Sequence, residues 1–199
     1  MGLIRTEAPG RLLDIAEVKE WLREDEDDND AAILRLIDAT ADSLDGAAGW
    51  LGRALRPQAW RKTMDRFPGR EIRIPLPPLI EVSQVAYYDA GGILQTLPPE
   101  RYQVAGVGDL NPGVLTPIEG EAWPATASRP EAVAISFRCG FAETGQPPKS
   151  AVPAAIVQAA MEMVAASYDT GSSGRPSLSA MLDADIGDRL ATYKVWYFA

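Results

Sequence analysis

Proline is distributed unevenly along this chain of 199 residues, and that distribution limits the fold more than any other feature. Thirteen of the sixteen prolines lie between residues 57 and 150. Because proline has no backbone N–H, it interrupts helices and is confined to edge strands, turns and loops. We therefore expect helices on both sides of this zone and short strands separated by turns within it.

The proline-rich zone contains short runs enriched in β-branched and aromatic residues, which favour strands. The sequence from Asp89 to Gly92 has the composition of a hairpin turn. These signals predict a small antiparallel β subdomain. Its expected strands cover residues 60–64, 71–74, 80–88, 102–105, 113–117 and 132–138.

Apolar residues recur with helical spacing in the N-terminal part of the chain. Asp14 is placed to cap a short first helix. A second helix is expected to begin after Asn29 or Asp30 and to follow its apolar stripe as far as Leu55, where Pro57 stops it.

Two further helices are expected near the C-terminus. Pro153 suits the first turn of a helix, and a Gly- and Ser-rich link at 170–176 precedes a last helix over 178–190. We therefore predict an α+β protein that is mainly α-helical. It would have about four helices and an antiparallel β subdomain inserted between the second and third long helices. The expected divisions are a helical domain of residues 12–56 plus 151–191, the β subdomain at 57–150 and a C-terminal tail at 192–199.

The composition excludes several kinds of chemistry. Histidine is absent, which removes His-dependent catalysis and His-ligated zinc. The single cysteine, Cys139, cannot form an internal disulfide or a Cys-rich metal site. No apolar run reaches the length of a membrane span or a signal peptide. We therefore expect a non-enzymatic protein of intracellular origin, without a cofactor or a metal.

The net charge of −9 is concentrated at the N-terminus, since residues 1–45 carry −8. Within this region an acidic segment resembles the start of a calcium-binding loop, but Asp30 and Leu36 occupy positions that require Gly and Glu. A solvated acidic turn leading into a helix N-terminus is the simpler interpretation. The alternative is a charge-repelling surface with a function of its own, made of Glu24, Asp25, Glu26, Asp27, Asp28 and Asp30.

Basic residues gather after the second helix, interleaved with Trp50, Trp60 and Phe67. Such a pattern is compatible with nucleic-acid binding, but Asp65 and Glu71 interrupt it. A protein-contact surface and an ordinary solvated surface remain as alternatives. The candidate inter-subunit basic residues are Arg53, Arg56, Arg61, Lys62 and Arg66.

The C-terminal tail is rich in aromatic residues, whereas free chain ends are usually polar. Trp and Tyr anchor many protein interfaces. The tail would therefore dock into another subunit or partner, or fold back on its own core. The residues concerned are Tyr193, Lys194, Val195, Trp196, Tyr197 and Phe198.

The order and spacing of seven motifs resemble the head–tail connector proteins (adaptor or head-completion proteins) of long-tailed phages and gene transfer agents. The resemblance extends over about residues 12–197. The motifs are Ala16–Arg23, Trp50–Leu55, Gln58–Trp60, Ile74–Leu79, Arg138–Phe141, Val152–Ile156 and Leu190–Trp196, and the acidic segment 24–30 follows the first of them.

This resemblance implies a structural protein that assembles as a ring, typically of twelve copies, beneath the portal of a phage-like particle made in the bacterial cytoplasm. The ring would extend the DNA channel, without binding DNA specifically, and provide a platform for the next tail-side protein, a stopper or tail terminator. Residues Tyr193 to Trp196 would grip the portal. The acidic residues of 24–30 would form a DNA-channel surface that repels phosphates, or an inter-subunit surface. Two alternatives from the residues alone are a small hydrolase using carboxylates of the β subdomain and a nucleic-acid-binding module.

Overall fold

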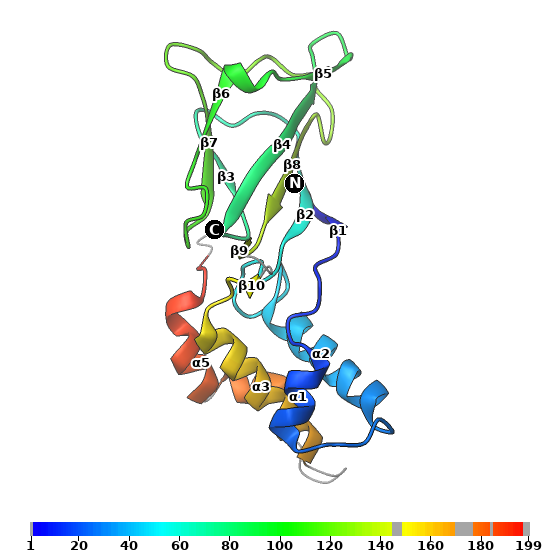
Figure 1. Ribbon diagram of the computed structural model, residues 1–199. Coiled ribbons are helices and arrows are strands. Elements are labelled where there is room, and N and C mark those ends of the chain that lie inside the picture. The colour runs from blue at the N-terminus through cyan, green and yellow to red at the C-terminus, as the bar shows by residue number, and fades with distance from the viewer. Residues whose placement is uncertain (1, 145–148, 170–176, 184, 197–199) are drawn as a thin grey trace. The chain divides into compact units, whose positions relative to one another are not determined.

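The computed structural model describes residues 2–144, 149–169, 177–183 and 185–196, and Figure 1 shows its elements along the chain. The chain divides into two compact units. The β unit combines residues 1–9 with 57–143, and the helical unit combines residues 10–56 with 144–199.

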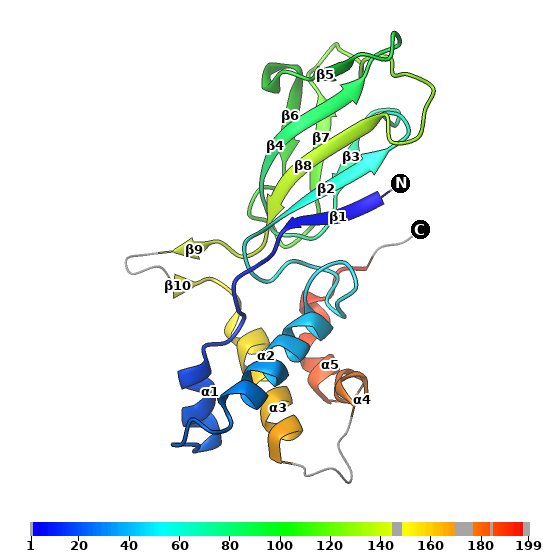
Figure 2. The same ribbon diagram turned by 90° about the vertical axis from the view of Figure 1, so that its right-hand side faces the viewer.

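The β unit contains two antiparallel sheets. The five-stranded sheet has the order β1-β2-β8-β4-β5, and the three-stranded sheet has the order β3-β7-β6. Figure 2 shows the smaller sheet lying behind the larger one, and the two form the layers of this unit. The strands are β1 (Gly2–Glu7), β2 (Gln58–Met64), β3 (Ile72–Ile74), β4 (Leu79–Tyr88), β5 (Leu94–Thr96), β6 (Tyr102–Ala105), β7 (Gly113–Pro117) and β8 (Val133–Cys139).

Alternating side chains from both sheets form the core of the β unit. In β8 every second residue is buried, from Val133 through Phe137 to Cys139. Ile74 and Leu115 of the smaller sheet are fully buried as well. The sheets approach closely at Gly113, where an added Cβ would lie 2.4 Å from a methyl carbon of Leu79. Glycine is therefore required at this position.

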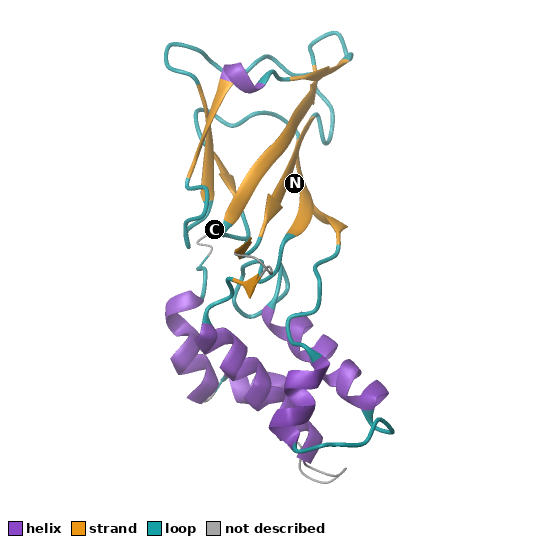
Figure 3. Cartoon of the chain, viewed as in Figure 1, coloured by secondary structure: helices purple, strands orange, loops and turns teal. Residues whose placement is uncertain are grey.

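The helical unit is built around α3 (Ala154–Asp169). Contacts connect this helix with α1 (Ile15–Leu22), α2 (Asp30–Leu44) and α5 (Asp185–Leu190), while α4 (Leu178–Leu182) contacts α2 and α5. The buried side chains that these helices share include Val18, Ile33, Ile37, Ile156, Met163, Val164 and Leu190. Two 3₁₀ turns, η1 (Pro99–Arg101) and η2 (Ala191–Tyr193), and the short strands β9 (Glu143–Thr144) and β10 (Lys149–Ser150) complete the chain. Figure 3 separates these classes by colour.

The expectation of a mainly helical protein is wrong, since the structure is 31% helical and 28% strand over the residues that it describes. Two physical reasons explain this result. The β unit includes an N-terminal strand, β1, which pairs antiparallel with β2 from Leu3–Lys62 to Arg5–Trp60. In addition, helix α2 ends at Leu44.

The second helix is shorter than its apolar stripe predicts. At its end Asp45 adopts an extended conformation, and the Asp45 carboxylate accepts a hydrogen bond from the Leu55 backbone N–H at 2.6 Å. Gly46 and Gly52 have positive φ angles, which helices do not tolerate. Leu51 and Leu55 are nevertheless buried. This part of the apolar stripe therefore results from the burial of a turn segment and does not indicate a helix.

The other local expectations have mixed outcomes. The six predicted strands are confirmed to within two residues at each end, and Asp89 closes the predicted hairpin by accepting hydrogen bonds from the N–H groups of Gly91 and Ile93. Asp14 caps α1 by accepting a hydrogen bond from the Ala16 N–H.

The prediction of one last helix over 178–190 is wrong, because this stretch contains two helices, α4 and α5. The predicted link at 170–176 lies outside the described residues.

Candidate functional site

The C-terminal segment is attached to the helical unit by the turn that follows α2. The Val195 N–H donates to the Leu51 carbonyl oxygen at 2.9 Å, and the buried Arg53 donates through Nε to the Tyr193 carbonyl oxygen. Tyr193 and Val195, which flank Lys194, are thus each held by a hydrogen bond. Residues 193–195 therefore belong to the helical unit.

A cation–π contact completes this attachment. The Lys194 ammonium nitrogen lies 3.8 Å from the ring centroid of Trp50 and 4.7 Å from that of Trp196. A cation near indole rings is attracted by their negative faces. Trp196 itself is 63% exposed. The structure thus shows a tail that folds back as far as Val195 and then presents a large aromatic side chain. Tyr197 and Phe198 lie outside the described residues.

The acidic segment is a turn between α1 and α2 fixed by three of its own carboxylates. Lys19 pairs with Asp27 at 2.5 Å and with Asp30 at 2.7 Å. The hydrogen bond to Lys19 lowers the pKa of Asp27, and the bonds to the two aspartates raise the pKa of Lys19. Tyr168 of α3 donates its hydroxyl to Glu24, and this bond raises the pKa of Tyr168.

The other three acids of this turn, Asp25, Glu26 and Asp28, are exposed. Among the described residues they have no ion-pair partner, and no group of three or more acidic or cysteine side chains there could hold a metal ion. The turn therefore divides its charges between three carboxylates that fix its shape and three that face solvent.

The five basic residues selected from the sequence do not form one surface. Arg53 and Arg56 belong to the helical unit, whereas Arg61, Lys62 and Arg66 belong to the β unit. Arg53 is 2% exposed and Lys62 is 7% exposed, and Arg56 is half-buried. Lys62 donates to the Arg73 carbonyl oxygen at 2.5 Å, and burial lowers the Lys62 pKa. Arg53 and Lys62 are thus structural, while Arg61 and Arg66 are exposed.

The exposed basic side chains of the β unit centre on the loop between β2 and β3, residues 65–71, which we name the arginine loop. Phe67 stacks on Trp123 with ring centroids 4.9 Å apart and an interplanar angle of 5°. The Trp123 indole N–H donates to the Arg70 carbonyl oxygen at 3.0 Å, and Asp65 accepts from the Glu131 N–H at 2.9 Å. These contacts fix the loop and leave Arg66 and Arg70 exposed.

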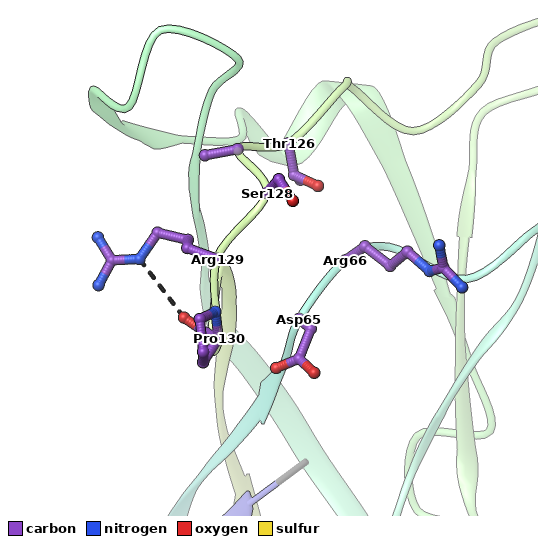
Figure 4. Close-up of a pocket in the computed structure, with 7 residues that line it drawn as sticks. Asp65, Arg66, Thr126, Ser128, Arg129 and Pro130 are labelled. Atoms are coloured by element: carbon purple, nitrogen blue, oxygen red, sulfur yellow. Dashed lines mark hydrogen bonds between the residues drawn. The ribbon is translucent and has the colours of Figure 1, made fainter.

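Two open grooves border the arginine loop. One is lined by residues 62, 64–69 and 71–73. The other contains Asp65, Arg66 and Arg129, and in the view of Figure 4 the two arginine side chains extend in opposite directions. The two carboxylates that line these grooves both have partners. Glu71 lies 3.5 Å from Nε of Arg73, and Asp65 accepts the hydrogen bond from the Glu131 N–H. The grooves therefore present cationic groups and no free pair of carboxylates.

Sequence reasoning missed two parts of these surfaces. Trp123 was not singled out, although an isolated tryptophan in a proline-rich loop is a signal that a neighbouring loop is packed there. Trp50 stands in the basic segment and in one of the resemblance motifs, but nothing local indicates that its partner is Lys194. Within the described residues, no helix is long and apolar enough to cross a membrane.

The sequence matches no protein-family model and no curated protein sequence. Solved structures of gene transfer agent (GTA) particles, however, contain chains with the same fold. A chain in the virion of a native GTA particle aligns with a TM-score of 0.75 and 20% identity, covering 100% of this chain and 98% of that one. The neck of an empty GTA particle, computed with C6 symmetry, gives 0.73 and 20%, and the neck of a native particle, computed with C12 symmetry, gives 0.66 and 22%. Both of these matches also cover 100% of this chain and 98% of the other.

Proposed function

We propose that this chain is a structural head–tail connector of a phage-like particle, either a phage or a gene transfer agent. Copies of it form a ring of about twelve on the portal, extend the DNA channel and provide the attachment platform for the tail. The chain does no chemistry, and its partners are other copies of itself, the portal and a tail-side protein.

One observation carries this proposal: the fold likeness extends over both units and nearly the whole length of chains in GTA particles. A neck structure computed with C6 or C12 symmetry contains each chain in several equivalent copies. This supports a ring. The order of motifs in the sequence supports the same assignment independently.

The C-terminal segment supplies the attachment to the portal. Because Tyr193 to Val195 are held by the helical unit, Trp196 is the described residue of the tail that is available to a partner. One exposed aromatic side chain per copy binds weakly, but a ring engages many of them at once, and each later contact forms at a high effective concentration.

Imaging of particles tests the proposed place of the chain. Particles carrying a labelled copy should show the label as a ring at the head–tail junction by electron microscopy. Label elsewhere, or none, contradicts the proposal.

The attachment itself is tested by Trp196→Ala, with Trp21→Ala as the matched control because Trp21 is a 50% exposed tryptophan of the same unit. We expect Trp196→Ala to reduce the copies per particle by about tenfold or more, as for a loss of about 1.4 kcal/mol per contact or greater. Trp21→Ala should leave the number unchanged. Equal incorporation of both variants would remove the tail from the interface.

No observation favours a hydrolase, since Asp65 and Glu71 at the grooves have structural partners. None favours a DNA-binding module either, because the burial of Arg53 and Lys62 breaks up the basic segment.

A further inference from the structure

We propose that the arginine loop of one copy docks on the acidic turn (residues 24–30) of the next copy in the ring. Arg66 and Arg70 on the β unit would pair with Asp25, Glu26 and Asp28 on the neighbour's helical unit. This inference rests on the proposed ring and assigns its subunit contact.

The first argument is that both surfaces have charges without partners. Arg66 and Arg70 are exposed, and the structure shows no side-chain ion pair for either among the described residues. The same holds for Asp25, Glu26 and Asp28. Guanidinium groups bind carboxylates bidentately, which gives such a pair a defined geometry.

The second argument is that both surfaces are held in shape before any contact is made. Phe67 and Trp123 fix the arginine loop, and Lys19 fixes the acidic turn through Asp27 and Asp30. Preorganised groups lose little conformational entropy on docking. Exposed arginines and acids on frayed segments would not offer this advantage.

The third argument concerns symmetry. The two surfaces are different and complementary, and they lie on different units of one chain. A contact between unlike surfaces of identical copies is heterologous, and it generates a ring when the rotation closes. Two copies joined by like surfaces would instead stop at a dimer.

A second copy fits the arginine loop better than DNA does. Asp65 and Glu71 interrupt the basic side chains of the loop, so the loop offers no continuous cationic track for the regularly spaced phosphates of DNA. A compact acidic turn contacts Arg66 and Arg70 without spanning those carboxylates. The chain also supplies such a turn itself, at one per copy.

Charge reversal tests the contact in assembled particles. Arg66→Glu and Arg70→Glu should each reduce the copies per particle by about tenfold or more, because like charges then face each other across the interface. Arg35→Glu, which reverses an exposed charge on α2, is the matched control and should have no effect. Thermal unfolding of each purified variant should match the unchanged protein.

Rescue makes the test specific. The double variant R66E/R70E should fail to incorporate, and adding D25R/D28R to the same chain should restore incorporation to within about twofold. A rescue identifies the two surfaces as partners. If the variant with all four substitutions folds but incorporates as poorly as R66E/R70E, the proposed pairing is wrong.

Cross-linking shows which copy is touched. The only native cysteine, Cys139, is buried, so Asp28→Cys with Arg70→Cys introduces the reactive thiols. A short bismaleimide should convert particle-bound chains into a ladder of multiples of 21.5 kDa. Links within single chains, or none at all, overturn the proposal.

The outcomes separate this inference from the proposed function. If the unchanged chain forms no ring in particles, the proposed function fails. If the ring is present but charge reversal, rescue and cross-linking all leave it unaffected, only the subunit contact fails. If R66E/R70E leaves the ring intact and alters only DNA retention, the arginines face DNA and the contact proposed here is wrong.

Discussion

The two units of this chain hold their outlying segments in different ways. In the β unit the N-terminal strand β1 is attached along a ladder of main-chain pairs with β2. In the helical unit single side chains help to attach the acidic turn and the C-terminal segment, among them Lys19, Arg53 and Lys194, beside one main-chain bond from Val195 to Leu51. A main-chain ladder tolerates most side-chain changes, whereas an attachment through one side chain depends on that residue.

Deleting residues 2–7 should produce the largest effect, because it removes a whole edge of the five-stranded sheet and uncovers Trp60, over which Arg5 lies at 4.9 Å. The lost pairing corresponds to on the order of 3 kcal/mol in the free energy of unfolding of the β unit. Chemical denaturation measures it, and hydrogen exchange of the β2 amides should accelerate.

Ile4→Thr is the control for the ladder, since the Ile4 side chain is 57% exposed and its replacement keeps the backbone. We expect a change within about 0.5 kcal/mol. A loss as large as that of the deletion would mean that side chains, and not main-chain pairing, attach β1, and the contrast between the units would disappear.

Arg53→Met should destabilise the helical unit by about 2 kcal/mol, because the Tyr193 carbonyl oxygen loses a charged donor and the buried site loses its hydrogen bonding. The observation specific to a loosened C-terminal segment is faster hydrogen exchange at the Val195 amide, which donates to the Leu51 carbonyl oxygen. Arg35→Met, an exposed change on α2, is the control. Unchanged protection of Val195 would show that Arg53 does not hold the C-terminal segment.

The sequence predicts the elements that depend on neighbouring residues, and it fails where contacts between distant residues determine the structure. The six strands of the proline-rich zone follow from local composition. Strand β1 does not, because its pairing depends on β2, far along the chain. The length of α2 was overestimated because Leu51 and Leu55 are buried at helical spacing without being helical. The partners of Lys194 and Arg53 are likewise distant in sequence, so a tail attached to its own unit could not be distinguished from a free one.

Lys194→Met should have a smaller effect. Methionine keeps an apolar stem against Trp50 but removes the cation, so only the cation–π part is lost, about 0.5–1 kcal/mol at a partly exposed site. A double-mutant cycle with Trp50→Leu isolates this contribution in chemical denaturation. Strictly additive effects of the two substitutions would show that Lys194 and Trp50 are not coupled.

The smallest effect concerns pH and the acidic turn. Lys19 lowers the pKa of Asp27 in the folded state, so this pair stabilises the protein above the unfolded pKa of Asp, about 3.9, and the stabilisation is lost as pH falls through the lowered value.

The difference in stability between the unchanged protein and Lys19→Met should therefore be constant from pH 7 to about pH 5 and shrink in more acidic solution. Asp25→Asn, at a position with no partner among the described residues, should show no such narrowing. Denaturation midpoints at pH 7, 4 and 2.5 measure both differences. If the Lys19→Met difference persists at the lowest pH, the side chain of Lys19 acts through packing and not charge, and the helical unit then resembles the β unit in being insensitive to single charges.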